Sequence, residues 1–509
     1  MTNDHNKKPK RGSIATFGLL AGLLLAVLVY VALPETYINS TGAQIPLPEA
    51  ARMVAAIATL MAVWWMTEAI SIYATALIPL ALFPLTGVAD IKLTAASYGN
   101  PIVYLFLGGF IVALALERWG LHRRLALNVL AGVGANPRAI VGAFMAVSAV
   151  LSMWVTNTAT TIMLLPVAVS VITLLPDNDL ADGSADSPFA ICMLLGIAYA
   201  ASIGGMGTII GTAPNVFVVA FLNEHLDREI GFLEWMRFAV PLVIVFVPLA
   251  WLVLTRLVYP VRADEIEGAA QLLAAERARL PPLCRGEVLT LLVFLLTAAA
   301  WVSRPLLNQW EIAGQQPLTG LTDAGIAVIA ALVLFICPVS FKRREFLMDW
   351  QTAAKLPWGL LILFGGGLAL AAGLSDSGFS EYLGNLSGGL AGLPVWVIVM
   401  AVITAVVFLT ELTSNTATTA TLVPIFLAVA IGLELPPLVL ILPATLAASC
   451  AFMLPVATPP NAVVFGSGYL SVGQMIRAGF WLNLAAIVLL TLATWGVILP
   501  VLGIDLQSP

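Results

Sequence analysis

The feature that most constrains this chain is a polar stretch inside a long apolar run. Residues 410–419, TELTSNTATT, carry six hydroxyl side chains, one amide and one carboxylate, and they lie within the apolar run 395–435. If that run crosses a membrane, no water reaches these groups, and each needs an internal partner or a ligand. Residues 152–161, SMWVTNTATT, repeat the pattern. A polar cluster that occurs twice predicts a binding site built from two repeats.

The composition places the chain in a membrane. Hydrophobic residues make up 60% of its 509 residues and charged residues only 10%, which excludes a soluble domain. Runs of about 20 apolar residues predict spanning helices. The four cysteines form no CxxC pair, so we expect buried free thiols rather than disulfides or a metal site. The three histidines lie at the terminus or at segment ends, which argues against zinc or haem.

The order of charges and apolar runs predicts the topology. Lys7, Lys8, Lys10 and Arg11 precede the apolar run 16–33, which predicts a retained first span with the N-terminus in the cytoplasm. Further spans are predicted at 51–66, 69–85, 238–258, 288–302 and 324–338. The acidic segments 34–49 and 176–188 contain no Lys or Arg and are expected outside. The charged segment 262–285 predicts a cytoplasmic surface helix and linker between two halves.

Three motifs recur in the same order in both halves. The glycine pair that begins at Gly108 recurs from Gly365, 257 residues later, and Asn157 recurs as Asn415, 258 residues later. The stretch TAPN that begins at Thr212 recurs as TPPN from Thr458, after 246 residues. The missing 12 residues match the size of the acidic loop that only the first half has. An inverted repeat is compatible with the charges and would put both polar breaks near the bilayer midplane.

A helix broken at each polar cluster would offer two kinds of site. Unpaired amides at the start of the following half-helix, together with the helix dipole, favour an anion. Carbonyls before the break and the Asn amide oxygen could ligate a small hard cation such as Na+. One Ser or Thr alone would more simply hydrogen-bond across packed helices, and one Pro would simply kink a helix. Repetition with the same Asn favours a site.

Two carboxylates fall within or beside apolar runs. For both, the functional interpretation is a proton relay or a cation ligand. Glu411 lies four residues before Asn415, and we expect it to hold the broken helix by hydrogen bonds. Glu68 follows two tryptophans, so we expect an interfacial structural role. Catalytic motifs such as HExxH, GxSxG or a Walker sequence are absent in a credible context, as is a charged pore ring, so we expect neither an enzyme nor a channel.

These motifs resemble the divalent-anion:sodium symporter family, which includes Na+/dicarboxylate, Na+/citrate and Na+/sulfate cotransporters. Residues 448–464, ASCAFMLPVATPPNAVV, match the family signature, and 414–416, SNT, match its second Ser-Asn-Thr motif. Residues 156–158, TNT, match the first motif with Thr in place of Ser, and 64–70, WWMTEAI, also look like a family motif. The resemblance covers nearly the whole chain.

The resemblance implies the ligands of each site. It assigns the substrate site to Thr156, Asn157, Thr158, Thr212, Ser414, Asn415, Thr416, Thr458 and Pro459. It assigns a first sodium site to Ser152, Thr156, Asn157 and Gly211. It assigns a second sodium site to Thr410, Thr413, Asn415 and Ala457, in part through backbone carbonyls.

The resemblance also implies the architecture. We expect an all-α polytopic membrane protein with two inverted repeats, re-entrant hairpins near 101–127 and 358–383, broken helices and about 11 transmembrane segments. The expected parts are a cytoplasmic tail (1–15), N-terminal scaffold helices (16–100), a first transport repeat (101–222), scaffold helices with the linker (223–357), a second transport repeat (358–468), and a C-terminal amphipathic segment with the last span (469–509). We further expect a homodimer with an elevator-type transport domain.

The function expected on this basis is import of C4-dicarboxylates such as succinate, malate and fumarate, driven by Na+, across a bacterial inner membrane. Lipid and a small dianion are the expected partners, without nucleic acid. A Na+-independent dicarboxylate exchanger is the first alternative, and a sulfate or citrate carrier is the second. The Ser-Asn-Thr-Ala-Thr wording from Ser414 favours the dicarboxylate branch over the sulfate branch.

Overall fold

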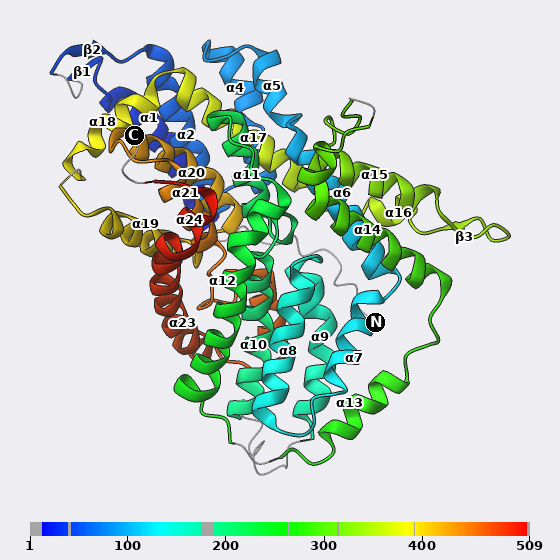
Figure 1. Ribbon diagram of the computed structural model, residues 1–509. Helices are drawn as coiled ribbons and strands as arrows, with labels where there is room; N and C mark the ends of the chain where they lie inside the picture. The colour runs from blue at the N-terminus through cyan, green and yellow to red at the C-terminus, as the bar shows by residue number, and fades with distance from the viewer. Residues whose placement is uncertain are drawn as a thin grey trace, which may run out of the picture.

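The structure is a computed structural model, and it describes residues 13–38, 42–174, 187–262, 265–312, 315–390 and 392–505. It is built almost entirely of helices (Figure 1). The basic residues Lys7 to Arg11 and nearly all of the acidic loop 176–188 lie outside the described residues. All four cysteines are free. Cys192 and Cys450 are buried as predicted, but Cys337 is half-buried and Cys284 is exposed at the N-cap of a helix.

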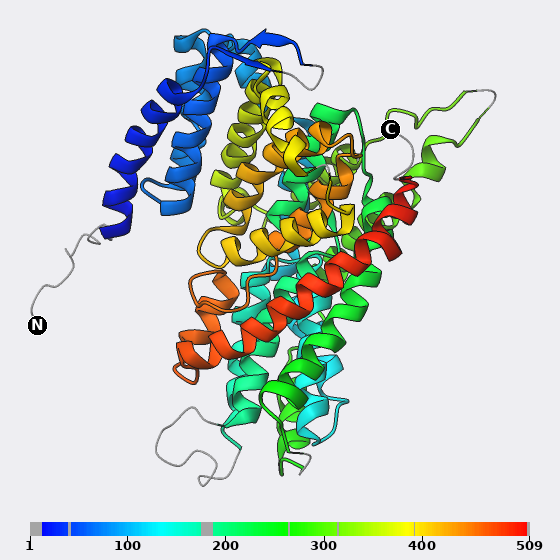
Figure 2. The same cartoon turned by 90° about the vertical axis from the view of Figure 1, so that its left-hand side faces the viewer.

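The N-terminal helices form a group of their own. Helix α1 (Ser13–Ala32) packs along α2 (Glu49–Thr67), and the small hairpin β1 (Thr36–Ile38) and β2 (Gln44–Pro46) joins them. Figure 2 shows this pair standing along one side of the molecule. The side chain of Glu68 is exposed at the end of α2, where its backbone adopts a left-handed conformation. That position agrees with an interfacial role.

The span predicted at 69–85 is interrupted. It consists of α3 (Ile72–Thr75) and α4 (Ile78–Thr86). Pro79 lies in the first turn of α4, where it cannot donate a hydrogen bond back to α3, so the helix stops before it. Helix α5 (Ile91–Tyr98) follows, with Asp90 accepting a hydrogen bond from the Leu93 amide at its start.

Each half contains a helix–turn–helix pair at the position of its predicted hairpin. In the first half, α6 (Pro101–Arg118) is followed by α7 (Leu121–Leu130). In the second half, α17 (Trp358–Asp376) is followed by α18 (Phe379–Leu386). Gly120 and Gly378, which are 258 residues apart, have φ of 67° and 82° and form the turns. Helices α5 and α6 together form an apolar run of 28 residues, so re-entry of the first pair stays a prediction.

Both polar clusters break a helix, as predicted. Helix α8 (Pro137–Ser152) ends at the first residue of the first cluster, and α9 (Asn157–Ile172) begins within it. Helix α19 (Val395–Thr410) and α20 (Asn415–Gly432) repeat this arrangement. The second predicted break of each half is also present. It separates α10 (Pro188–Gly205) from α11 (Ala213–Leu226), with a 3₁₀ turn at Ile209–Gly211, and α21 (Leu438–Ala448) from α22 (Pro459–Phe465).

The remaining elements complete two similar halves. Helix α12 (Phe232–Leu252) ends in a π-helical turn at Val253–Val258, and α23 (Val472–Ala493) ends in one at Thr494–Ile498 before α24 (Leu499–Leu502). The linker contains α13 (Ala269–Ala278), as predicted. After it come α14 (Arg285–Asn308), α15 (Asp323–Ile336), the hairpin β3 (Pro338–Ser340) and β4 (Glu345–Phe346), and α16 (Trp350–Ala353). A 3₁₀ turn at Ser387–Leu390 follows α18.

The two halves are oriented oppositely and exchange contacts. Helices α8 to α10 lie at one end of the molecule and α19 to α21 toward the other (Figures 1 and 2). Helix α6 of the first half packs on α15 of the second, while α17 packs on α2 to α5 of the first. At these two contacts a Cβ on Gly108 would lie 2.5 Å from the Ala327 backbone, and one on Gly366 would lie 2.2 Å from the Ala76 backbone. Only glycine permits such a close approach at each of these two contacts.

Among the described residues, nine helices are long and apolar enough to cross a membrane, or up to ten if the bent pair Phe379–Leu390 and Val395–Thr410 is one span. The sequence predicted about 11. The difference arises at the breaks, since apolar helices such as α8 and α9 have 16 residues each and are too short to count alone.

Candidate substrate and cation site

Four half-helices begin at the breaks, and their packing joins the two halves. Helix α22 packs against α9 and α10, while α11 packs against α20 and α21. Each therefore lies against the broken helices of the other half. The residues just before the four helices are Thr156, Thr212, Ser414 and Thr458, all of them predicted substrate ligands. The first amides of a helix have no partner within it, so hydroxyls and free amides are concentrated here.

The predicted substrate residues differ in exposure. Most are half-buried: Thr156, Asn157, Thr158, Thr212, Ser414 and Asn415. Thr416 and Thr458 are buried, and Pro459 is exposed. The hydroxyls of Thr156 and Thr458 accept hydrogen bonds from the amides of Ala159 and Asn461. Ser414 and Thr212 make no such bond in the described structure, which leaves their hydroxyls available to a ligand.

The predicted first cation site has oxygens without partners. The Ser152 hydroxyl and the Asn157 amide oxygen are buried and make no hydrogen bond to any described residue. Asn157 Oδ1 and the carbonyl of Gly211 converge on Gly205, where an added Cβ would lie 2.8 Å and 3.2 Å from them. A buried oxygen without a partner is costly, and a small cation would satisfy several at once. The unpaired oxygens are of the kind that suits a small hard cation such as Na+.

The predicted second cation site is internally hydrogen-bonded. The Thr410 hydroxyl lies 2.7 Å from Asn415 Oδ1 and 3.0 Å from the carbonyl of Ala448, so its one hydrogen serves two acceptors. Thr413 donates to the Leu409 carbonyl at 3.0 Å. Ala457 is buried in the unwound segment between α21 and α22. The Thr410 and Thr413 hydroxyls would exchange hydrogen bonds for a cation, unlike the unpartnered Ser152 hydroxyl and Asn157 amide oxygen of the first half.

Glu411 fixes the unwound segment before α22. Its carboxylate is 3% exposed and accepts the backbone amides of Phe452, Met453 and Leu454 at 2.7–3.1 Å. The side-chain amide of Asn483 on α23 donates to the same carboxylate at 2.8 Å. Glu411 thus acts through hydrogen bonds, as predicted, although its partners lie 41 to 72 residues away rather than within its own helix.

Two asparagines, Asn215 and Asn461, hold the second breaks in place. They end the repeated stretches TAPN and TPPN, and no role was predicted for either. The Asn215 side-chain amide donates to the carbonyls of Gly205 and Thr208 at 3.1 Å and 2.8 Å. Asn461 donates to the equivalent carbonyls of Ala451 and Leu454, both at 3.1 Å. All three pairs of equivalent positions are 246 residues apart. The signal in the sequence was the same Asn at the end of both TAPN and TPPN.

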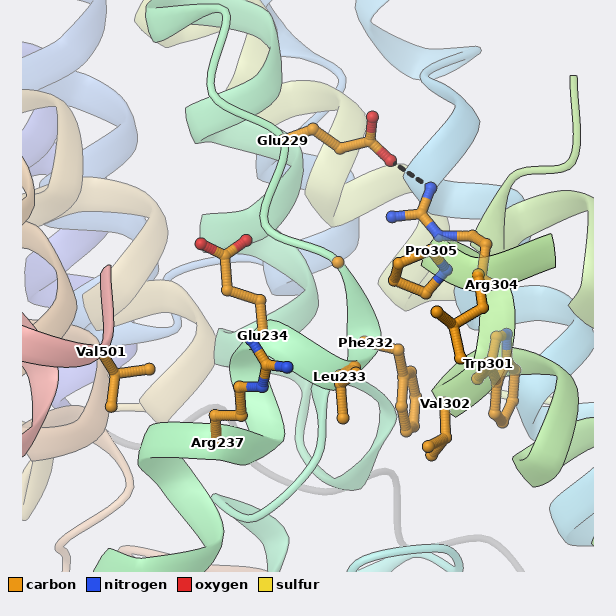
Figure 3. Close-up of a pocket in the computed structure, with 12 residues that line it drawn as sticks. Glu229, Phe232, Leu233, Glu234, Arg237, Trp301, Val302, Arg304, Pro305 and Val501 are labelled. Carbon is orange, nitrogen blue, oxygen red and sulfur yellow. Dashed lines mark hydrogen bonds and ion pairs between the residues drawn. The ribbon is translucent and has the colours of Figure 1, made fainter. Parts of the chain in front are cut away.

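A separate pocket of about 430 Å³ lies between the start of α12 and the end of α14 (Figure 3). Arg304 lines it and pairs with Glu229 at 2.7 Å and with Asp323 at 2.9 Å. None of the predicted site residues lines this pocket. The lining carries two arginines, Arg237 and Arg304, and two carboxylates, Glu229 and Glu234, so it has no excess of positive charge that would favour an anion.

Comparisons with known proteins agree with the motifs. The profile of a family described as the sodium:sulfate symporter transmembrane region matches residues 22–502. The chain is 39% identical over 498 residues to the sodium-dependent dicarboxylate transporter SdcS of Staphylococcus saprophyticus, covering 97% of this chain and 93% of that protein. It is 38% identical over 506 residues to SdcS of Staphylococcus aureus, covering 99% and 95%.

Two solved structures share the fold at low sequence identity. The Alcanivorax borkumensis YdaH transporter has a TM-score of 0.58 at 14% identity, covering 97% of this chain and 98% of that one. Neisseria gonorrhoeae MtrF has a TM-score of 0.57 at 13% identity, covering 97% of both. The sequence match is what establishes the family: this chain belongs to the divalent-anion:sodium symporters, described as the sodium:sulfate symporter family, and is a multi-pass membrane transporter rather than an enzyme.

Proposed function

We propose that this protein imports C4-dicarboxylates such as succinate, malate and fumarate by Na+ symport. The observation that carries the proposal is the duplicated break, in which a Ser or Thr, an Asn and a Thr begin a half-helix in each half. The SdcS relatives, named sodium-dependent dicarboxylate transporters, favour this substrate class over sulfate or citrate.

The anion would bind where the half-helices begin. A dicarboxylate carries a negative charge at each end, and the two halves offer one set of amides and hydroxyls each. Thr156, Asn157 and Thr158 would hold one carboxylate, and Ser414, Asn415 and Thr416 the other. Thr212 and Thr458, with Pro459, would complete the site from the second breaks. Thr156 keeps the hydroxyl of the family Ser and adds a methyl group.

Sodium would bind beside each half of the anion site. The unpaired oxygens of Ser152 and Asn157 support the first position, where Thr156 and Gly211 would add ligands. Thr410, Thr413, Asn415 and Ala457 would provide the second. Because each Asn belongs to both the cation and the anion set, a bound cation would fix the amide that contacts the substrate. This shared ligand would couple Na+ binding to dicarboxylate binding.

The proposed transport movement is of the elevator type, in a homodimer in the bacterial inner membrane with a cytoplasmic N-terminus. Residues 101–222 and 358–468 would move as one part against the scaffold formed by the rest. The two broken helices belong to the moving part, so substrate and ions would travel with it. The contacts of α6 with α15 and of α17 with α2 to α5 join the two parts and would carry the movement.

The site assignment is tested by removing each shared amide. We expect Asn157→Ala and Asn415→Ala each to lower dicarboxylate uptake by roughly tenfold or more, since each change removes a buried polar ligand. Folded protein should remain in the membrane at normal levels. Asn128→Ala is the matched control, because Asn128 is an exposed asparagine on α7. Normal uptake by both site variants would refute the assignment.

A further inference from the structure

A second pocket lies at the end of α6, away from both breaks. Its volume is about 360 Å³, and its lining consists of Arg118, Arg343, Arg344, Glu345, Phe346 and Asp349. The residues come from α6 and from the segment around β4, which meet although they are more than 200 residues apart in the chain. The β3–β4 hairpin extends outward beside α15 and α16 (Figure 1). Nothing in the proposed transport cycle uses this pocket.

Hydrogen bonds and one ion pair hold the wall of the pocket in place. Arg118 pairs with Asp349 at 2.6 Å, and the indole of Trp119 donates to the Leu347 carbonyl at 2.9 Å. Asp349 also accepts the Thr352 amide at the start of α16. The Thr352 amide and the Arg118 guanidinium hold the pKa of Asp349 below its ordinary value. The wall is therefore a fixed, charged structure at neutral pH.

The pocket has positive charge that nothing described neutralises. Arg343 and Arg344 are exposed, and neither forms an ion pair with any described residue. Lys342 precedes them, and Glu345 is the one acidic lining residue besides Asp349. Counting Arg118 with Asp349 as a pair, the two free arginines face a single carboxylate. Arg343 and Arg344 both line the pocket, and their guanidinium groups provide the forked donors that suit a phosphate group.

The pocket lies where apolar surface ends. The candidate span Ile91–Arg118 ends here, and Arg285–Asn308 begins here, with the Trp119 ring against Gly286. Helix α15 leads to the hairpin and exposes an apolar side: Ile329 is 56% exposed, Leu332 54% and Ile336 71%. A soluble anion would make no use of this apolar surface, whereas lipid acyl chains would cover it.

Three exposed aromatic side chains lie on the hairpin and at the starts of α16 and α17. They are Phe341 at 78%, Trp350 at 65% and Trp358 at 39% exposure. Amphipathic rings concentrate at the membrane–water boundary, where one edge is apolar and the other is wet. Basic pockets at such a boundary suit the head groups of anionic lipids. The arginines, the apolar side of α15 and the aromatic rings therefore fit one ligand with a charged head and apolar chains.

We propose that this pocket binds the phosphate of an anionic membrane phospholipid, with its acyl chains along α15. Arg343 and Arg344 hold the phosphate, while Arg118 stays paired with Asp349 in the wall of the pocket. Phe346 packs beside the head group. The bound lipid fixes α15, on which α6 packs, and so stabilises the contact between the two halves.

The test measures phosphatidylglycerol binding to the purified full-length protein by native mass spectrometry, with phosphatidylcholine as the neutral comparison. Removing both free arginines in R343Q/R344Q should weaken phosphatidylglycerol binding about twenty-five-fold, since each basic residue near an anionic head group contributes about fivefold. R262Q/R277Q is the control, because both of those arginines are exposed in the linker region and removing them changes the net charge equally. Unchanged binding in R343Q/R344Q, or an equal loss in the control, would overturn the proposal.

Two further arms separate folding and ligand source. R343K/R344K keeps both charges but neither fork, so it should bind more tightly than R343Q/R344Q and less tightly than the parent protein. Inorganic phosphate and glycerol 3-phosphate, added to the protein in the presence of phosphatidylcholine as the only lipid, should not bind the pocket. Binding of either with the same dependence on Arg343 would show a soluble-anion site and contradict the lipid assignment.

Discussion

Glu411 offers a sharp test of how the unwound segment before α22 is held. Its carboxylate accepts three consecutive backbone amides and one side-chain amide, all from segments at least 41 residues away. The Leu454 carbonyl in turn accepts the amides of Ala457 and the Asn461 side chain. A change at Glu411 therefore reaches the residue predicted to ligate the second cation.

The expected cost differs between two substitutions. Glu411→Ala leaves four donors without a partner, two of them buried and two half-buried, at no more than about 1–3 kcal/mol each, or at most roughly 4–12 kcal/mol together. That is comparable to the whole stability of a typical domain, so little folded protein is expected. Glu411→Gln retains one acceptor oxygen, and its NH₂ group then faces the Leu454 amide. We expect a local loss of about 1–3 kcal/mol.

The assay is the Na+ dependence of dicarboxylate uptake. For Glu411→Gln, a loss of about 1–3 kcal/mol corresponds to a rise of roughly 5- to 150-fold in the half-saturating Na+ concentration, with folded protein present. Glu68→Gln is the matched control, since that carboxylate is exposed at the end of α2. Wild-type Na+ dependence and normal folded yield in Glu411→Ala would refute this account of the segment.

Three other changes test separate contacts. Asn461→Ala should raise the half-saturating Na+ concentration about tenfold in an uptake assay, because the Ala451 and Leu454 carbonyls lose their donor. An unchanged value would show that the segment keeps its conformation without this side chain. Gly366→Ala should lower the melting temperature in detergent, because its Cβ would lie 2.2 Å from the Ala76 carbonyl oxygen. Gly473→Ala is the control, because its Cβ meets open space and should leave the melting temperature unchanged. Equal melting temperatures for the two variants would contradict the packing of α17 described above. Thr410→Val should weaken Na+ binding by about fivefold to tenfold without loss of folded protein, as read by Na+-dependent fluorescence, and unaltered binding would remove Thr410 from the cation set.

Much of the fold followed from the sequence because its signals were strong and repeated. The polar clusters predicted the breaks after Ser152 and Thr410, since no continuous apolar helix tolerates so many polar groups. The repeated offsets predicted two similar halves, and the turn glycines Gly120 and Gly378 conform to the same spacing. At the two breaks and the two turns, the local residue chemistry and the repeat spacing therefore predict the same structure.

Other features depended on contacts that no local pattern encodes. The break at Pro79 lies in a run that has the length and hydropathy of a span. The clamp by Glu411 depends on amides and on Asn483, which only the fold brings near. The difference between the two cation sites is equally invisible in the motifs, because it arises from whether the Asn amide oxygen has a hydroxyl partner.

The central claim is that Na+ and a dicarboxylate are transported together. The most direct measurement is uptake of labelled succinate into proteoliposomes, with and without an inward Na+ gradient and with K+ or Li+ in its place. We predict uptake only with Na+. Uptake without Na+ that requires internal dicarboxylate would contradict symport and establish an exchanger, and no uptake in either condition would contradict succinate as the substrate.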